Sequence, residues 1–288
     1  MPERPTFLSV CIRVHPWLVN KGLIMRIRYG ILLLGAVALA QESGNRVTVQ
    51  FSDPSRPGVL KGSRMNGCFE VEGYDGRDIV VEGKQGQSIR NRRAPKGAEG
   101  LHRIDPDGLG VTVDVENNTA IIRGANGADL RIRVPRSTSL NLSCLNGGDL
   151  TVTGLNGDLE LNNHNSSVIA TGISGSVVAH SLNGRVAVSL DRVAPGKSMS
   201  FSSLNGDIDV TLPADTKATV RTKSDNGETF TDFEVTMQPS QPVVEDNRSK
   251  GGKYRVKSDR TMVGNINGGG PDLTLKTLNG NIYLRKKK

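Results

Sequence analysis

The chain has 288 residues, with 37 Lys and Arg against 29 Asp and Glu, which gives a formal net charge of +8. Residues 1–40 hold five basic residues and one acidic residue, so residues 41–288 carry 32 against 28, a net charge of +4 that the last four residues alone account for. A folded body this close to neutral lacks the basic surface typical of nucleic-acid binding. We therefore expect no nucleic acid among its partners.

The first forty residues differ from the rest and predict export. Residues 25–40 have the pattern of a signal peptide, with the basic start Met25–Arg28, an apolar run and the cleavage site Ala38–Ala40 before Gln41. The apolar run is too short to cross a bilayer comfortably. Residues 1–24 would make an unusually long leader, so we interpret them as a non-native upstream extension. The expected mature protein is periplasmic, envelope-bound or extracellular, with no stable transmembrane segment after processing.

Short alternating segments separated by turn residues predict an all-β protein. In residues 41–135, the N-terminal β coils, the expected strands are Val47–Phe51, Met65–Val71, Asp78–Glu82, Gly110–Val115, Thr119–Arg123 and Asp129–Val134. Between the third and fourth of these lies an irregular stretch near 85–110, which is basic at first and rich in Gly and Pro. This composition favours a surface loop or a partly helical insertion.

Residues 136–288 are punctuated by Asn-Gly pairs and end in a basic tail. The whole chain has nine such pairs, and the five that follow a leucine come after Leu145, Leu155, Leu182, Leu204 and Leu278. Asn-Gly is a strong turn signal because both residues tolerate positive φ. After each of these turns apolar and polar residues alternate, as in Leu159-Glu160-Leu161, which predicts a half-buried strand.

Two architectures suit these repeats. An antiparallel meander or sandwich would use each Asn-Gly as a hairpin turn. A single elongated β-solenoid, with coils of about twenty residues, would use them as corners. Identical residues recur in identical phase, which favours the solenoid because equivalent positions then stack. In that arrangement the leucines before Asn-Gly would form inner ladders.

Several motifs together resemble a known family. Leu130–Pro135 leads into the Leu-Asn-Gly array, Asp207–Asp215 follows within it, and the chain closes with Gly264–Pro271 and Thr277–Ile282. This pattern, over most of residues 45–285, resembles the bacterial putative-adhesin family of β-strand-repeat proteins with toast-rack-like domains. The resemblance implies a right-handed β-solenoid on an exported or envelope protein. It implies adhesion or envelope-stress signalling, and it supplies no catalytic residues.

No cofactor or metal site is expected. Calcium needs about six to eight converging oxygens, but the positions equivalent to Asp158 and Asp207 include Arg185 and Asn281. The histidines left after processing are His102, His164 and His180, and none lies at metal-ligand spacing from another His or a Cys.

No catalytic residue is assigned either. The close carboxylate pairs are Asp158 with Glu160 and Asp207 with Asp209. Each pair occupies alternate positions of one predicted strand, about 7 Å apart. No neighbouring residue would perturb either pair toward the acid that glycoside hydrolysis needs.

Cys68 and Cys144 remain after processing. Export would permit a disulfide between them, but they occupy different phases of the repeat, two after and two before the Asn. Small residues fill the second position elsewhere, so Cys144 fits there as a buried thiol. Free thiols are the favoured interpretation, and pairing stays open.

These observations predict an exported, non-enzymatic envelope or extracellular binding protein, an adhesin whose partner is an unknown surface protein or glycan. An envelope-stress sensing or regulatory domain is the alternative, and a polysaccharide-processing enzyme is a third. The tail residues Arg285, Lys286, Lys287 and Lys288 could add weak contact with anionic surfaces.

Overall fold

The computed structural model describes residues 46–84, 110–124, 127, 129–239, 243–246, 254–257 and 260–288. The proposed extension 1–24, the signal peptide 25–40 and all of the predicted loop near 85–110 except Gly110 lie outside these residues. The described residues form strands and no helix, so the all-β prediction is confirmed. Within the same ranges, no helix has the length and apolarity to cross a membrane.

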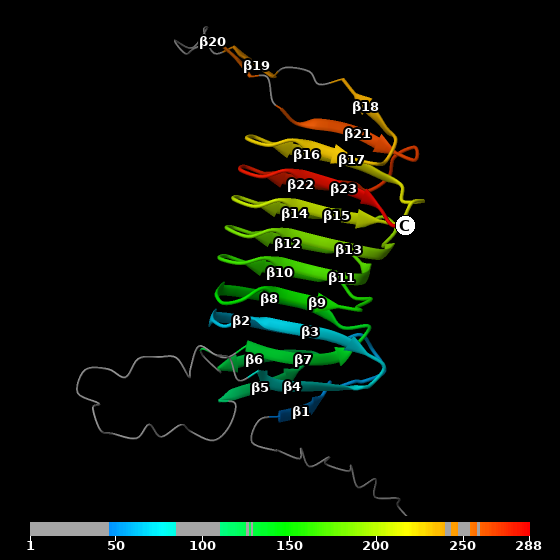
Figure 1. Ribbon diagram of the computed structural model, residues 1–288. Coiled ribbons are helices and arrows are strands. Elements are labelled where there is room, and N and C mark those ends of the chain that lie inside the picture. The colour runs from blue at the N-terminus through cyan, green and yellow to red at the C-terminus, as the bar shows by residue number, and fades with distance from the viewer. Residues whose placement is uncertain are drawn as a thin grey trace, which may run out of the picture. The chain divides into compact units, whose positions relative to one another are not determined.

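The strands form two large mixed sheets and one small antiparallel pair (Figure 1). In spatial order, sheet A contains β1 (Arg46–Gln50), β4 (Asp78–Lys84), β7 (Asp129–Pro135), β3 (Phe69–Tyr74), β9 (Leu150–Thr153), β11 (Val168–Gly175), β13 (Val186–Val193), β15 (Ile208–Leu212), β23 (Ile282–Lys286) and β17 (Thr229–Thr231). Sheet B contains β18 (Val235–Gln238), β21 (Met262–Ile266), β16 (Ala218–Ser224), β22 (Asp272–Thr277), β14 (Met199–Ser203), β12 (Val177–Ser181), β10 (Leu159–Asn163), β8 (Ser139–Asn146), β2 (Val59–Asn66), β6 (Thr119–Gly124) and β5 (Val111–Glu116). The small pair is β19 (Val243–Asp246) with β20 (Tyr254–Lys257).

Consecutive strands of the central region alternate between the two sheets and are not hairpin partners. Each pairs in parallel with the strand two further along, so that Leu159 of β10 lies opposite Leu140 of β8 and Val177 of β12. These partners are 19 and 18 residues apart, close to the expected step of about twenty. We call one strand of sheet B together with the following strand of sheet A a rung.

The rungs do not stack in chain order. The rung β2–β3 lies between β6–β7 and β8–β9, and the C-terminal rung β22–β23 lies between β14–β15 and β16–β17. Ile282 consequently pairs with Ile208 on one side and with Thr229 on the other. The basic tail therefore belongs to a strand within the stack, β23, and not to a rung at its end.

The core lies between the two sheets and consists of the inward residues of each strand. Among the corner leucines, only Leu155 is fully buried, whereas Leu145, Leu204 and Leu278 are 37–38% exposed and Leu182 is half-buried. The prediction of inner ladders is therefore wrong for four of the five. The reason is that Leu155 lies at the corner from sheet A to sheet B, while the other four lie at the corner from sheet B to sheet A.

At the corners of Leu182, Leu204 and Leu278, a buried Ser or Thr takes the inward position two before the Asn, and Cys144 takes it beside Leu145. Ser203 Oγ donates to the carbonyl of Gly184 at 2.9 Å, and Thr277 Oγ1 donates to that of Gly206 at 3.0 Å. Both hydroxyl residues are buried. A buried carbonyl needs a hydrogen-bond partner, which a leucine could not supply, so the leucine points outward.

At the corners of Gly184 and Gly206, glycine is required by close stacking and not by positive φ. Gly184 and Gly206 are absent from the positive-φ residues, so the turn chemistry expected for Asn-Gly does not hold at their corners, whereas Gly67 has a φ of 86°. A Cβ on Gly206 would lie 2.2 Å from the carbonyl oxygen of Gly184 in the next rung. Positive-φ turns occur in the hairpin between β5 and β6, at Asn117 (48°) and Asn118 (59°), and between β21 and β22, where the Asn-Gly pair Asn267 (49°) and Gly268 (87°) has the expected conformation.

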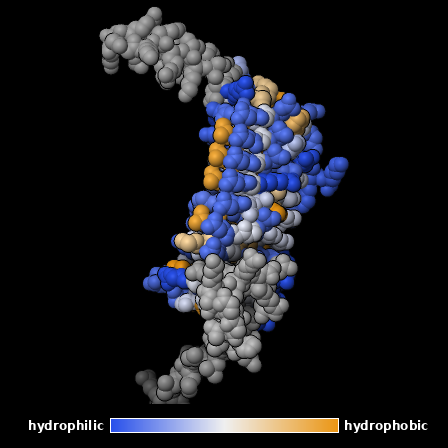
Figure 2. Space-filling view, turned by 60° about the vertical axis from the view of Figure 1, so that its left-hand side comes forward, coloured by the Kyte–Doolittle hydropathy of each residue, from blue (hydrophilic) through white to orange (hydrophobic). Residues whose placement is uncertain are grey.

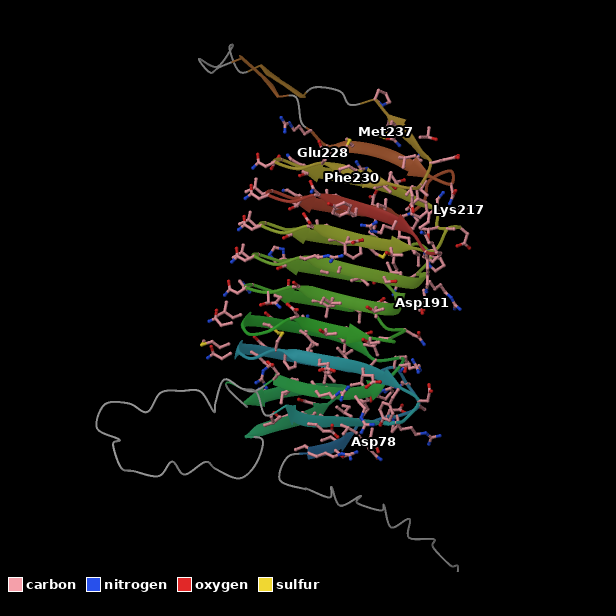
Figure 3. The ribbon with its side chains drawn as sticks, viewed as in Figure 1. Asp78, Asp191, Lys217, Glu228, Phe230 and Met237 are labelled. Carbon is pink, nitrogen blue, oxygen red and sulfur yellow. A yellow bond between two sulfur atoms is a disulfide. The ribbon has the colours of Figure 1, made fainter. Side chains whose placement is uncertain are left out.

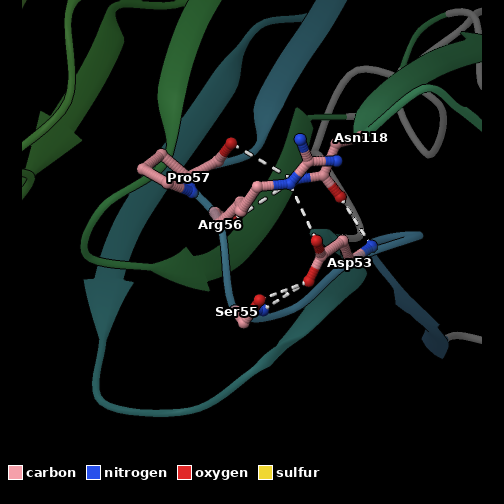
Figure 4. Close-up of polar contacts among 5 residues, drawn as sticks. All are labelled: Asp53, Ser55, Arg56, Pro57 and Asn118. Atoms are coloured by element: carbon pink, nitrogen blue, oxygen red, sulfur yellow. Dashed lines mark hydrogen bonds and ion pairs between the residues drawn. The ribbon is translucent and has the colours of Figure 1, made fainter.

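Asn118 also ties that hairpin to the segment before β2. Its Oδ1 accepts from the Asp53 amide at 2.8 Å, and its Nδ2 donates to the carbonyls of Arg56 and Pro57 at 3.2 Å (Figure 4). The carboxylate of Asp53 accepts in turn from Ser55 and from Arg56 Nε. These contacts anchor the chain where it enters the rung β2–β3.

Cys68 and Cys144 form a disulfide with a Cα–Cα distance of 5.5 Å, so the expectation of free thiols is wrong. Cys144 occupies the small-residue position at the end of β8, and Cys68 follows the corner of the neighbouring rung. Asn66 and Asn146 lie in register in neighbouring rungs. Cys144, two residues before the Asn of one rung, therefore meets Cys68, two residues after the Asn of the other. The different positions of the two cysteines within their own repeats therefore did not exclude a contact between neighbouring rungs.

The two kinds of corner predict different costs of truncation. Leu155→Ala removes a fully buried side chain and should lower the free energy of unfolding by about 3 kcal/mol. Leu182→Ala, at a half-buried corner, should cost no more than about 1 kcal/mol. Urea unfolding of both variants measures the difference. Equal losses would contradict the distinction between the corners.

Candidate functional site

The carboxylates considered as an acid pair are held by structural contacts. Asp158 Oδ2 lies 2.6 Å from Lys197 Nζ, and its Oδ1 accepts from the amide and hydroxyl of Ser176. The hydrogen bond from Lys197, followed by those from Ser176, lowers the pKa of Asp158. A glycosidase acid needs a raised pKa, so this environment works in the opposite direction. Glu160 accepts from Asn141 Nδ2 at 2.6 Å.

The second pair joins neighbouring rungs. Asp207 Oδ1 accepts from the Asn281 amide at 2.7 Å. Asp209 lies between Arg185 Nη2 at 2.6 Å and Arg285 Nε at 2.9 Å, and its side chain is 14% exposed. The hydrogen bond to Asp209 raises the pKa of Arg285. Both carboxylates therefore serve as acceptors for the adjacent rungs.

The two histidines among the described residues, His164 and His180, do not form a metal site. His180 Nδ1 lies 2.9 Å from Ser202 Oγ, and burial, followed by the nearby His164, lowers the pKa of His180. His102 falls outside the described residues. Within the part of the chain that the structure describes, no three His, Cys, Asp or Glu residues are grouped to hold a metal ion.

The basic tail contacts the body of the protein. Arg285 pairs with Asp209, Lys287 Nζ lies 2.6 Å from Asp191 Oδ1, and Lys286 Nζ lies 5.4 Å from the centroid of the Phe233 ring. Exposed ion pairs of this kind contribute at most about 1 kcal/mol each. Contact with an anionic surface stays a prediction, and it would compete with these partners.

A ladder of asparagine side chains runs along the corner from sheet B to sheet A. In stacking order its members are Asn146, Asn165, Asn183, Asn205, Asn279 and Asn226. Each Nδ2 donates to the Oδ1 of the preceding member, over distances of 2.7 to 3.0 Å. The Asn of the repeat is thus a corner residue that links one rung to the next.

The position just before the Asn holds His164 and Asp225 beside Asn165 and Asn226, but in five other rungs it holds apolar side chains. They are Met65, Leu145, Leu182, Leu204 and Leu278. Met65 is the most exposed, at 63%. We call these five residues and the asparagine ladder the corner ridge. Figure 2 shows its apolar column along one edge of the molecule.

Sequence reasoning identified the residues of the corner ridge but placed the leucines inside. The missed signal was the small residue just before each of these leucines, which takes the inward position. Sequence reasoning also missed an aromatic pair on sheet A, Phe230 and Tyr283, whose rings stack with centroids 5.5 Å apart. The residue pattern that the rungs share, which we call the template, did not predict this pair, because Asp209 occupies the equivalent position on β15.

No protein-family model and no curated protein matches the chain. Solved structures that are similar to it include the following three. A putative cell adhesion protein from Clostridium sporogenes ATCC 15579 is 10% identical, with a TM-score of 0.42, and the match covers 84% of this chain and 99% of that one. A putative adhesin from Bacteroides fragilis NCTC 9343 is 11% identical, with a TM-score of 0.31 and coverage of 85% and 98%. A putative adhesin from Parabacteroides merdae ATCC 43184 is 10% identical, with a TM-score of 0.22 and coverage of 84% and 95%. Two of these three proteins are named putative adhesins and the other a putative cell adhesion protein, which agrees with the resemblance seen in the sequence.

Proposed function

We propose that this chain is an exported, non-enzymatic binding protein of the cell envelope or extracellular space, an adhesin, and that its stacked rungs form a β-solenoid. The observation that carries the proposal is the corner ridge. Its apolar side chains lie on five rungs beside a row of amides, with Leu182, Leu204 and Leu278 on three successive rungs and His164 separating them from Leu145 and Met65. Contiguous exposed apolar surface of this kind is typical of an interaction site.

The ladder asparagines have polar groups to offer a partner. Asn205 donates one amide hydrogen to Asn183 and accepts one from Asn279. A side-chain amide has two hydrogens and two acceptor lone pairs, so one of each remains for a ligand. The leucines supply apolar contact area on the same edge. Together they suit an extended partner that lies along several rungs.

The disulfide supports export, because such bonds persist mainly outside the reducing cytosol. The signal-peptide pattern of residues 25–40 supports it independently. The intact mass of the protein recovered from the envelope or medium should be that of a chain whose first residue is Gln41. Recovery of the full chain with a reduced Cys68 would contradict export.

The ridge is tested by removing its apolar column. We expect the triple variant Leu145→Ser, Leu204→Ser and Leu278→Ser to bind the purified envelope fraction of the source cells at least about tenfold more weakly, since exposed apolar anchors dominate such contacts. Val178→Ser is the matched control, because Val178 is 46% exposed but lies on the outer face of β12, away from the ridge.

Melting curves of both variants should show that each is folded. Unchanged binding by the folded triple variant, or an equal loss in Val178→Ser, would contradict the role of the ridge. Depolymerisation of envelope glycan by the wild-type protein would contradict the non-enzymatic assignment.

A further inference from the structure

A second exposed feature lies at the last strand of sheet A among the described residues, β17. Phe230 of β17 stacks on Tyr283 of β23, with an interplanar angle of 13°. The guanidinium of Arg285 lies 5.1 Å from the Tyr283 ring centroid and is fixed by Asp209. Tyr283 is thus held between neighbours, whereas Phe230 is 46% exposed.

Two hollows flank Phe230. A shallow one of about 180 Å³ is lined by Phe230, Asp232, Tyr283 and Arg285. A larger one of about 490 Å³ is lined by Phe230, Glu228, Arg260 and Met262. Figure 3 labels Glu228 and Phe230 close together at the upper part of the stack. The phenylalanine ring therefore stands between two hollows, each of which contains a carboxylate and a guanidinium.

This chemistry fits a sugar ring. A β-linked pyranose of gluco configuration has equatorial hydroxyls, so its faces present only C–H groups and stack on a flat aromatic ring. Its hydroxyls project sideways, where a carboxylate accepts hydrogen bonds and a guanidinium donates them. An apolar wall with a few converging polar groups is the usual design of a small-ligand site.

We propose that Phe230 is the stacking platform of a saccharide-binding site for β-linked, gluco-configured glycans. Glu228 and Arg260 bind hydroxyls in the larger hollow, and Asp232 and Arg285 bind those in the smaller one. The inference rests on the binding role proposed above but uses a surface separate from the corner ridge. A peptide added as a strand to β17 suits the site less well, because the strand has only three residues and offers few backbone groups.

The test is calorimetric titration of the full chain with cellotetraose and with tetra-N-acetylchitotetraose. We expect binding of at least one of them, and a loss of roughly tenfold or more in Phe230→Ala, as for other truncated stacking aromatics. Phe230→Leu should lose as much, because it keeps apolar area without a flat ring. Phe230→Trp should retain binding, and Glu228→Gln should weaken it.

Met237→Ala is the matched control, since Met237 is 55% exposed on β18 of the other sheet and should leave the affinity unchanged. Absence of binding to both tetrasaccharides overturns the proposal, as does full affinity in Phe230→Ala. Preferential binding of an extended peptide that survives Phe230→Ala would identify the β17 edge as a peptide site instead. None of these results depends on the ridge, whose triple variant should bind the tetrasaccharides normally.

Discussion

Cys144→Ser is expected to lower the free energy of unfolding by about 4 kcal/mol. The disulfide joins residues 76 positions apart, and closing a loop of that length removes much of the entropy of the unfolded chain, by about 4 to 5 kcal/mol in the loop-entropy model. Serine should fit locally, because Ser181 and Ser203 occupy the equivalent position in other rungs and donate to corner carbonyls. The loss should therefore report the covalent link and not a packing defect.

Urea unfolding with and without reductant measures this effect. Reduced wild-type protein, Cys144→Ser and the double variant Cys68→Ser with Cys144→Ser should share one unfolding midpoint, well below that of the oxidised wild type. Reductant should not change the double variant. A wild-type midpoint that is insensitive to reductant would contradict the stabilising role of the bond.

The strand pattern could be predicted because burial enforces it locally. Pairs such as Leu159 with Leu161 and Ile208 with Val210 are all buried, as the alternation of apolar and polar residues indicated. A period of two leaves each strand one way to bury its apolar face. The step of about twenty residues followed from equivalent residues in equivalent phase, which stack favourably in parallel.

The order of the rungs could not be predicted for the same reason. Because the rungs share one template, each can pair with several others, and nothing local indicates that β22–β23 inserts between β14–β15 and β16–β17. The disulfide depended on this order, since Cys68 meets Cys144 only because β2–β3 lies beside β8–β9. Contacts between segments far apart in the sequence could therefore not be predicted from the repeat pattern.

The candidate sites were hidden by the same repetition. Phe230 occupies a template position filled by Asp209 in β15 and Ala187 in β13. Its exposure follows from the place of β17 at the end of sheet A, which only the rung order determines. The corner leucines were misplaced because a hydrophobic residue next to a turn usually points inward. Beside Leu182, Leu204 and Leu278, the preceding Ser or Thr takes that position and satisfies corner carbonyls.

The adjacent residues Gly147 and Gly148 offer the sharpest test of stacking at the corners. A Cβ on Gly147 would lie 2.5 Å from the carbonyl carbon and oxygen of Gly67 in the next rung and 3.0 Å from the amide of Cys68. These are backbone atoms that cannot rotate away. Gly147→Ala must therefore push two rungs apart beside the disulfide, and we expect it to cost about 4 kcal/mol, at the upper end of overpacking effects.

Gly148→Ala is the matched control in the same corner. Its Cβ would meet only Asp129 Oδ2, at 4.0 Å, and the residue has no positive φ. Alanine should be neutral there or stabilise by about 0.5 kcal/mol, because it restricts the unfolded chain. Urea unfolding of both variants under oxidising conditions measures the difference. Similar effects of the two substitutions would contradict this steric explanation. A loss confined to Gly147→Ala would show that glycine follows asparagine because the next rung leaves no room for a side chain.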